Sequence, residues 1–374
     1  MHSFSLLLKP VSADCNLRCK YCFYLETCNL YAQDKKHRMQ DEVLKRIIQS
    51  YLSTAQEVYS FIWQGGEPVL MGTEFFRKIT DLQKIHALPG SRISNALQTN
   101  ATLIRDDLAR HLAHYCFLVG CSLDGPAPVH DFYRRTKKHT GSHALVQNGL
   151  NKLKKQQVEP NILTLVSQAN VHNPLEIYSY LKQEGYRYQQ YIPCVEFDEQ
   201  GMLLPFAITG EQWGDFLCEI FDKWYANDVH TVSIRLFESI LYYLIAQRRN
   251  SCAMAETCCQ YLVVEYNGDV YPCDFFVTRE LKLGNIMSDS WEEMLSSNLY
   301  HEFGARKKMM HPKCLECEFL NLCMGDCQKH RLKNGQNMDN LSALCSGWRQ
   351  FFSYTLQRFQ KLAQHIKNRA AQKV

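Results

Sequence analysis

Three cysteines close to the N-terminus are spaced for metal chemistry. They lie in the run Cys15-Asn-Leu-Arg-Cys19-Lys-Tyr-Cys22, which follows a short apolar segment at 4–8. Three thiolates can hold three irons of a cubane [4Fe–4S] cluster, whereas full ligation uses four cysteines. The fourth iron is therefore left open to an external ligand that offers a chelating amino and carboxylate group.

S-adenosylmethionine (SAM) carries both groups, and radical chemistry is a recognised use of SAM with an iron–sulfur cofactor. The spacing also resembles the C-x3-C-x2-C signature of the radical SAM superfamily, and Tyr21 stands where that family carries an aromatic residue. A zinc knuckle or three incidental cysteines is the alternative. Because zinc sites usually show paired C-x2-C units or added histidines, the motif favours a SAM-binding cluster.

Eight further cysteines gather in the C-terminal third of the chain. They are enough for two fully ligated [4Fe–4S] clusters. They include a C-x2-C pair, which is also zinc-ribbon spacing, so taken alone they leave zinc and iron–sulfur equally open. A SAM cluster must be supplied with electrons, and this favours iron–sulfur. The eight are Cys252, Cys258, Cys273, Cys314, Cys317, Cys323, Cys327 and Cys345.

The other cysteines have no assigned ligand role. Cys259 directly follows Cys258 and can be the true ligand in its place. The rest are expected to be buried apolar thiols. They are Cys28, Cys116, Cys121, Cys194 and Cys218.

The composition indicates a reduced protein. Seventeen cysteines in 374 residues would suggest disulfides in a secreted chain, but residues 1–9 lack the long apolar run and cleavage site of a signal peptide. No apolar run reaches membrane-spanning length. We therefore expect a cytoplasmic protein without a membrane partner, whose thiols stay available as ligands. A net charge of +4 without a dense Lys/Arg block gives no indication of nucleic-acid binding.

Residues 1 to about 200 alternate short β-rich runs with longer helical ones. Six successive βα units imply a parallel sheet with right-handed crossovers, so the sequence predicts an α/β fold of the partial (β/α)6 TIM-barrel type. The predicted strands are 4–8, 58–63, 92–97, 117–122, 161–166 and 188–192, and the predicted helices are 41–55, 73–86, 105–114, 143–156 and 174–184.

The pattern changes after residue 210. Two helices with apolar stripes are predicted within 211–249, and they form the link between domains. An Asn267-Gly268 turn predicts a hairpin over 261–271. From Trp348 to Ile366 the apolar spacing predicts an amphipathic helix that docks on the body.

The ends of two predicted strands also look functional, because barrels of this type carry their chemistry at the C-terminal ends of strands. Gln64-Gly65-Gly66-Glu67-Pro68 follows the second strand, and adjacent glycines let the backbone approach a ligand closely. This run resembles the GGEP element that meets the SAM amino group in radical SAM enzymes. After the fourth strand, Ser122 and Arg134 can hold the ribose and carboxylate of SAM. A simple turn and a solvated arginine are the alternative.

Over nearly the whole chain, the cysteine spacing resembles that of the anaerobic sulfatase-maturating enzymes, a SPASM-domain subgroup of the radical SAM superfamily. These enzymes also carry an aspartate directly after the third auxiliary cysteine, here Asp274. The resemblance implies a radical SAM partial barrel at 1–230. It implies a linker helix, a SPASM auxiliary-cluster domain and a C-terminal helix at 231–374.

The resemblance further implies three [4Fe–4S] clusters and their ligands. Cys15, Cys19 and Cys22 would hold the SAM cluster. The family's crossed pattern gives the first auxiliary cluster Cys252, Cys258, Cys273 and Cys327, and the second Cys314, Cys317, Cys323 and Cys345. The positions that match SAM contacts are Tyr21, Gly66, Ser122, Arg134 and Val195, and those that match the peptide site are Tyr24, Gln64 and Gln98.

The reaction implied by the resemblance is oxidation of a Cys or Ser side chain on a client sulfatase to Cα-formylglycine. Asp274 is the candidate base, since a carboxylate with a reference pKa of about 3.9 is ionised at neutral pH. The alternative is that Asp274 only satisfies a loop amide. The implied partners are an unfolded or nascent sulfatase polypeptide and a reductant such as flavodoxin or ferredoxin. We expect a monomer that works anaerobically.

Two other functions stay open at this point. Another SPASM enzyme would use the same radical machinery to make a thioether, a crosslink or an epimerised residue, and the cysteines cannot separate these reactions. The Cys273-Asp274 pair favours sulfatase maturation. A non-catalytic iron–sulfur electron carrier or zinc scaffold is the remaining alternative, and the SAM-site residues argue against it.

Overall fold

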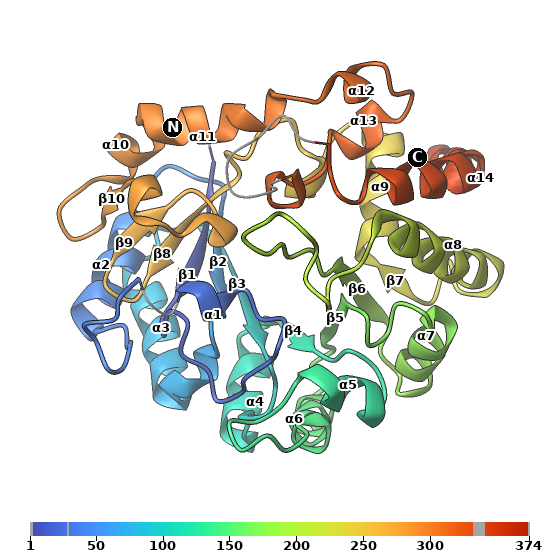
Figure 1. The fold of residues 1–374 in the computed structure, drawn as a ribbon. Coiled ribbons are helices and arrows are strands. Elements are labelled where there is room, and N and C mark those ends of the chain that lie inside the picture. Colours follow the sequence, from blue (N-terminus) through green and yellow to red (C-terminus); the bar gives the residue numbers. More distant parts are fainter. Residues whose placement is uncertain (1–2, 28–29, 332–340, 373–374) are drawn as a thin grey trace. The chain divides into compact units, whose positions relative to one another are not determined.

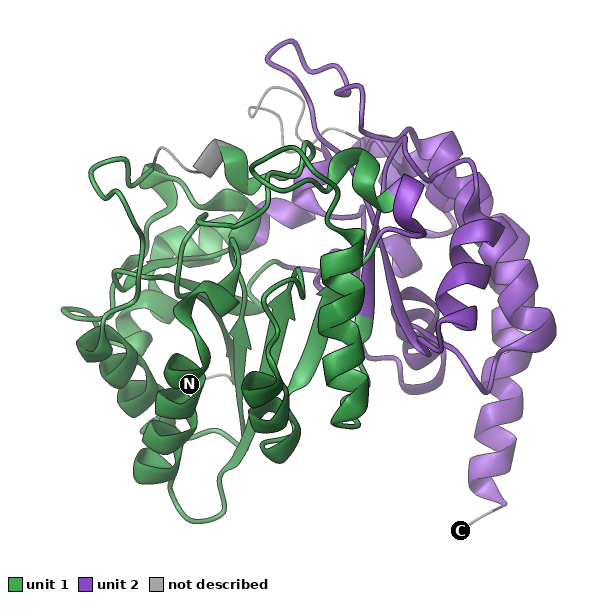
Figure 2. Ribbon diagram, turned by 90° about the horizontal axis from the view of Figure 1, so that it is seen from below, with its two compact units in different colours: residues 1–123, 130–161, 258–304 green, residues 124–129, 162–257, 305–374 purple. Residues whose placement is uncertain are grey.

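The computed structural model describes residues 3–27, 30–331 and 341–372 (Figure 1). Cys28 lies outside the described residues. The chain divides into two compact units that interleave along the sequence (Figure 2). The first unit comprises residues 1–123, 130–161 and 258–304, and the second comprises 124–129, 162–257 and 305–374. The boundary at residue 230 remains a prediction.

The first unit is built on a sheet with the strand order β10-β9-β8-β1-β2-β3-β4. Strands β1 to β4 are parallel neighbours in chain order, as the alternating βα pattern predicted. The strands are β1 (Ser5–Lys9), β2 (Val58–Trp63), β3 (Arg92–Thr99), β4 (Leu118–Ser122), β8 (Tyr261–Glu265), β9 (Asp269–Tyr271) and β10 (Gly284–Asn285).

The hairpin β8–β9 joins this sheet at the free edge of β1. Its two strands are antiparallel around the Asn267-Gly268 turn, as predicted. No pattern in the sequence predicted that β8 would pair with β1 in parallel, from Ser5 opposite Tyr261 to Lys9 opposite Glu265. This pairing brings a segment of the cysteine-rich region beside the first strand of the barrel.

Helices α2, α3 and α4 lie along one face of strands β1–β4 (Figure 1). Their buried residues recur at helical spacing, as in α2, where Leu44, Ile47, Ile48 and Tyr51 are buried. The helices of the first unit are α1 (Tyr24–Thr27), α2 (Asp41–Leu52), α3 (Thr73–His86), α4 (Asp106–His114), α6 (His143–Lys155), α10 (Trp291–Ser296) and α11 (Asn298–Ala305), with short 3₁₀ turns η1 (Pro68–Met71), η3 (Asp274–Phe276) and η4 (Arg279–Leu281). Helix α5 (Ala127–Tyr133) has residues in both units.

The second unit contains three strands and the longest of the described helices. Its strands are β5 (Asn161–Val166), β6 (Tyr188–Pro193) and β7 (Ser233–Ile234), in that order. Strand β7 pairs only with β6, and β10 of the first unit pairs only with β9. The described strands therefore form no closed barrel, as a partial barrel requires. The helices are α7 (Pro174–Gln183), α8 (Gly210–Asn227), α9 (Arg235–Ala246), α12 (Pro312–Leu315), α13 (Leu320–Cys323) and α14 (Cys345–Ala371), with 3₁₀ turns η2 (Cys252–Met254), η5 (Arg306–Lys308) and η6 (Gln328–Arg331).

The predicted elements agree with the structure within a few residues, but one burial prediction is wrong. Cys116 is exposed, because it lies in a left-handed turn (φ 51°) that ends α4. Cys121 and Cys194 are buried as predicted, and Cys218 is half-buried. Among the described residues, no helix has the length and hydropathy needed to cross a bilayer.

Helix α14 begins at Cys345 and packs closely on α8. Gly347 touches the α8 backbone so tightly that an added Cβ would lie 2.0 Å from the carbonyl oxygen of Gly210. The C-terminal helix thus docks as predicted, and its docking fixes the position of Cys345 within the second unit.

We predict that Gly347→Ala lowers the free energy of unfolding by about 1–3 kcal/mol, because overpacking a tight contact forces backbone shifts. Urea unfolding followed by circular dichroism measures the change. Ser353→Ala, at an exposed site of α14, is the control and should stay within about 0.5 kcal/mol of the parent. Equal stability of the two variants would contradict the close helix contact.

Candidate functional site

The three N-terminal cysteines lie in the loop that follows β1. The Cys15 thiol accepts hydrogen bonds from the Leu17 amide (3.4 Å) and from Asn100 Nδ2 (3.6 Å). Burial, and next the charge of Glu67, raises the pKa of Cys15 to about 12; the thiols of Cys19 and Cys22 contribute in the same direction. Three cysteine thiols in one loop are the donor set of a cluster that keeps one iron open.

The Gly-Gly turn after β2 touches this cysteine loop. Gly66 has a left-handed φ of 50°, and an added Cβ would lie 2.0 Å from the Asp14 carbonyl oxygen. The Glu67 amide donates to the same oxygen at 2.8 Å. Only glycine fits this close approach. The two sequence motifs are thus joined directly, backbone to backbone.

Glu67 ties the Gly-Gly turn to the end of β3. Its fully buried carboxylate accepts hydrogen bonds from the Thr99 hydroxyl (2.7 Å), the Asn100 amide (2.7 Å) and the Val69 amide (3.0 Å). Burial raises the pKa of Glu67, and these hydrogen bonds oppose the rise. Asn100 also reaches Cys15, so one connected network supports the cysteine loop.

Three of the residues predicted to contact SAM lie in two hydrogen-bonded pairs of the first unit, and the second pair includes the predicted peptide-site residue Gln98. Arg134 is buried and donates to the Tyr21 hydroxyl at 3.0 Å. Gln98, at the end of β3, donates to the Ser122 hydroxyl at the end of β4 across 3.4 Å. Val195 is buried just after β6 and belongs to the second unit. The roles of all five SAM-contact residues, and of Gln98, remain predictions.

Asp274 lies at the centre of a buried polar cluster within the first unit. The Tyr24 hydroxyl donates to its Oδ2 atom, and Gln64 Nε2 donates to the same atom at 3.2 Å. Gln64 Nε2 also lies 3.2 Å from the Tyr24 hydroxyl. Burial and the charge of Asp274 raise the pKa of Tyr24 well above its usual value, so the phenol stays protonated as a donor. The structure brings together the candidate base and two of the three predicted peptide-site residues.

Lys9 and Glu265 complete this cluster, and the sequence analysis did not select either. Lys9 Nζ lies 2.8 Å from Glu265 Oε1 and 3.4 Å from Asp274 Oδ1. A lysine at the end of an apolar strand was a usable signal, because a charged residue rarely occupies a buried strand without a partner. Its partner comes from the unpredicted β1–β8 pairing.

The second predicted auxiliary set lines one cavity of the second unit. Cys314, Cys317, Cys323 and Cys345 border a space of about 180 Å³, together with Asp326 and other residues. Four thiols around one cavity are the ligand number of a fully ligated [4Fe–4S] cluster, so the residues present fit that group.

Two buried cations bind the loops that carry Cys323, of the second predicted auxiliary set, and Cys252, of the first. Arg331 donates to the carbonyl oxygens of Gly325 at 2.6 Å and Met324 at 3.0 Å, both beside Cys323. Lys307 donates to the carbonyl oxygens of Cys252 at 2.8 Å and Ala253 at 2.7 Å. The sequence did not predict either residue. Each donates to backbone carbonyl oxygens, which every residue carries, so no spacing of residue types indicates the contact.

The first predicted auxiliary set is divided between the units. Cys258 and Cys273 belong to the first unit, whereas Cys252 and Cys327 belong to the second. Within the first unit, the Cys259 thiol donates to the Tyr300 carbonyl oxygen at 3.5 Å. Its sulfur also packs on Gly304, where an added Cβ would lie 2.0 Å away. Cys259 is thus occupied in packing against α11, which favours its neighbour Cys258 as the ligand.

Comparison with known proteins agrees with this geometry. Residues 10–181 match the radical SAM superfamily, and residues 252–318 match an iron–sulfur cluster-binding domain. The chain is 38% identical to a serine-type anaerobic sulfatase-maturating enzyme of Bacteroides thetaiotaomicron, over 98% of this chain and 92% of that one.

The chain belongs to the anaerobic sulfatase-maturating enzyme family.

A cysteine-type member from Clostridium perfringens is 35% identical over 98% of this chain and all of its own length. The structure of native anSMEcpe with bound AdoMet and the Cp18Cys peptide superposes with a TM-score of 0.90, at 35% identity, over 97% of this chain and 99% of that one. The chain is therefore a radical SAM enzyme with the predicted α/β fold and a SPASM domain. As a member of this family it binds SAM and carries iron–sulfur cluster domains.

We predict that Cys258→Ser lowers the iron content of the anaerobically reconstituted protein, whereas Cys259→Ser retains it. The physical reason is that the Cys259 thiol is held by Tyr300 and Gly304. Iron and sulfide assays per chain make the measurement. Iron loss in Cys259→Ser with full retention in Cys258→Ser would reverse the assignment.

Proposed function

We propose that this chain oxidises a Cys or Ser side chain of a client sulfatase to Cα-formylglycine. The observation that carries the proposal is the buried Asp274 carboxylate, held by Tyr24 and Gln64 in the unit that also contains the three-cysteine motif. Family members named cysteine-type and serine-type are both similar to this chain. Either side chain is therefore a reasonable client.

The proposed cofactor complement is SAM with three [4Fe–4S] clusters. Cys15, Cys19 and Cys22 would hold the SAM-binding cluster. Tyr21, Gly66, Ser122, Arg134 and Val195 would contact SAM, and Tyr24, Gln64 and Gln98 would line the peptide site. When bound, SAM and its cluster supply the radical that abstracts a hydrogen atom. The eight cysteines of the C-terminal region would hold the two auxiliary clusters in the sets given above.

Asp274 is the proposed base. The oxidation removes from the client a hydrogen atom at Cβ, a proton from the thiol or hydroxyl, and one electron, which an auxiliary cluster held by the C-terminal cysteines would accept. From serine these losses give the aldehyde directly. From cysteine they give a thioaldehyde, which water hydrolyses to the aldehyde with release of hydrogen sulfide. A radical at Cβ makes the adjacent proton far more acidic, so an ordinary carboxylate suffices as its acceptor. Tyr24 and Gln64 hold Oδ2 of Asp274, and this fixes the carboxylate while the proton moves.

The client is proposed to be an unfolded or nascent sulfatase polypeptide, because the modified side chain must enter a site whose base is only 4% exposed. A reductant such as flavodoxin or ferredoxin would supply electrons. We propose a cytoplasmic monomer that works anaerobically; comparison of iron content before and after exposure to air tests the oxygen sensitivity.

The deciding experiment is mass spectrometry of a synthetic sulfatase-motif peptide in Cys and Ser versions. The peptide is incubated anaerobically with reconstituted protein, SAM and dithionite. Conversion to an aldehyde supports the function and identifies the side chain. Deoxyadenosine with an unmodified peptide favours another SPASM reaction, such as thioether, crosslink or epimer formation. If a fully iron-loaded protein forms neither the aldehyde nor deoxyadenosine, the result favours an electron carrier.

We predict that Asp274→Asn retains its iron and cleaves SAM but forms formylglycine about 100-fold more slowly or less, since a positioned base typically contributes 10²–10⁴-fold. Mass spectrometry of the peptide gives formylglycine, and chromatography of the same sample gives deoxyadenosine. Glu280→Gln, at an exposed site of the nearby 3₁₀ turn η4, is the control. An unchanged formylglycine yield in Asp274→Asn would rule out the base role.

A further inference from the structure

Lys9 and Glu265 form a buried ion pair at the carboxyl ends of two neighbouring parallel strands. They are the last residues of β1 and β8 and stand opposite each other in the register. Their charged atoms are 2.8 Å apart, and both side chains are at most 1% exposed. The Lys9 ammonium group also lies 3.4 Å from Asp274 Oδ1. One cation is therefore shared by two buried carboxylates.

Lys9 is held firmly in this position. An added Cβ at Gly65 would lie 2.7 Å from its Cγ, so the turn backbone packs on the lysine stem. Its ammonium lies 4.7 Å from the centre of the Tyr24 ring, within the range of a cation–π contact. Burial alone would lower the pKa of Lys9, but the charges of Glu265 and Asp274 outweigh burial and raise it, so the ammonium stays charged.

Stability alone gives a weak reason for this arrangement. Removing charges from water costs free energy, and a buried ion pair is often no more stabilising than apolar residues of similar volume. What the pair does provide is geometry. Oδ2 of Asp274 is held by Tyr24 and Gln64, and its other oxygen faces Lys9. Oδ2 is thus held by hydrogen bonds, whereas Oδ1 has no hydrogen-bond partner among the described residues and is restrained by the charge of Lys9.

We propose that Lys9 is a positioning residue for Asp274, and that Glu265 anchors Lys9 in place. The proposal rests on the proposed base role of Asp274 and deepens it. Lys9 fixes the plane of the carboxylate, while Glu265 holds the ammonium at the strand end and prevents it from closing completely on Asp274. Neither residue needs to touch the client.

The test uses Lys9→Met, which keeps most of the stem and removes the ammonium. In the iron-loaded enzyme with SAM, dithionite and peptide, formylglycine formed per deoxyadenosine should fall about tenfold or more, since small misplacements of catalytic groups carry large rate costs. Iron content, deoxyadenosine formation and peptide KM should change less than about twofold. A purely structural role would lower iron loading and all these rates together.

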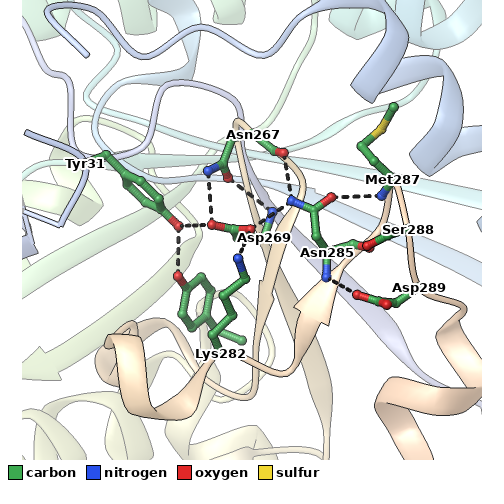
Figure 3. Close-up of polar contacts among 9 residues, drawn as sticks. Tyr31, Asn267, Asp269, Lys282, Asn285, Met287, Ser288 and Asp289 are labelled. Carbon is green, nitrogen blue, oxygen red and sulfur yellow. Dashed lines mark hydrogen bonds and ion pairs between the residues drawn. The ribbon is translucent and has the colours of Figure 1, made fainter. Parts of the chain in front are cut away.

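Two matched variants sharpen the result. Glu265→Gln keeps the shape of the Glu265 side chain and removes its charge. It should also lower the formylglycine formed per deoxyadenosine, but by less than Lys9→Met does. Lys282→Met removes an ammonium from another ion pair in the same region, where Lys282 Nζ lies 2.5 Å from Asp269 Oδ1 and the Lys282 side chain is 41% exposed (Figure 3). That pair includes no atom of Asp274, so the product ratio should stay at the parent value.

The outcomes separate this inference from the proposed function. If Lys9→Met and Glu265→Gln both form as much formylglycine per deoxyadenosine as the parent enzyme, the positioning role is overturned. If the parent enzyme itself makes no formylglycine, the proposed function fails, and urea unfolding of Lys9→Met, Asp274→Asn and the double variant still tests the contact. Non-additive shifts of the urea midpoint support coupling of the two residues, and additive shifts overturn it.

Discussion

The pairing of β8 with β1 is the interaction on which the candidate site depends. Five consecutive residues of each strand are in parallel register, from Ser5 opposite Tyr261 to Lys9 opposite Glu265. Because parallel strands end at the same edge of a sheet, this register brings the residues after Glu265 to the edge where the cysteine loop and the Gly-Gly turn already lie. The contacts of Asp274 with Tyr24 and Gln64 follow from it. A shift of one residue would turn Glu265 away from Lys9.

The same constraint explains why the sequence predicted some parts of the site and missed others. Cysteine spacing, the Gly65-Gly66 turn and the strand–helix alternation are local patterns, so each could be read from neighbouring residues. The β1–β8 pairing joins segments more than half the chain apart, and no local pattern encodes it. The sequence therefore could not predict the ion pair of Lys9 and Glu265, although it predicted the ends of both strands to within a residue or so.

The cysteine-rich region shows a second kind of limit. The spacing of its cysteines could be recognised from the sequence. Its loops, however, are held by Arg331 and Lys307, which donate hydrogen bonds to backbone carbonyl oxygens. Backbone acceptors are present at every residue, so the sequence does not mark which ones are used. The exposure of Cys116 was missed for a similar reason, since it follows from one left-handed turn rather than from residue type.

The late arrival of β8 also bears on how the protein is made. During synthesis, β1 and its parallel neighbours can pair long before residues 261–265 leave the ribosome. Until then β1 has an open edge, and unpaired strand edges are the surfaces through which nascent chains associate wrongly. The ammonium of Lys9 at that edge also has no carboxylate from Glu265 until β8 docks. Docking of β8 therefore covers the open edge of β1 and pairs Lys9 with Glu265 in one step, before β9 and β10 extend the sheet. A nascent chain that ends before β8 can have neither the covered edge nor the Lys9–Glu265 pair.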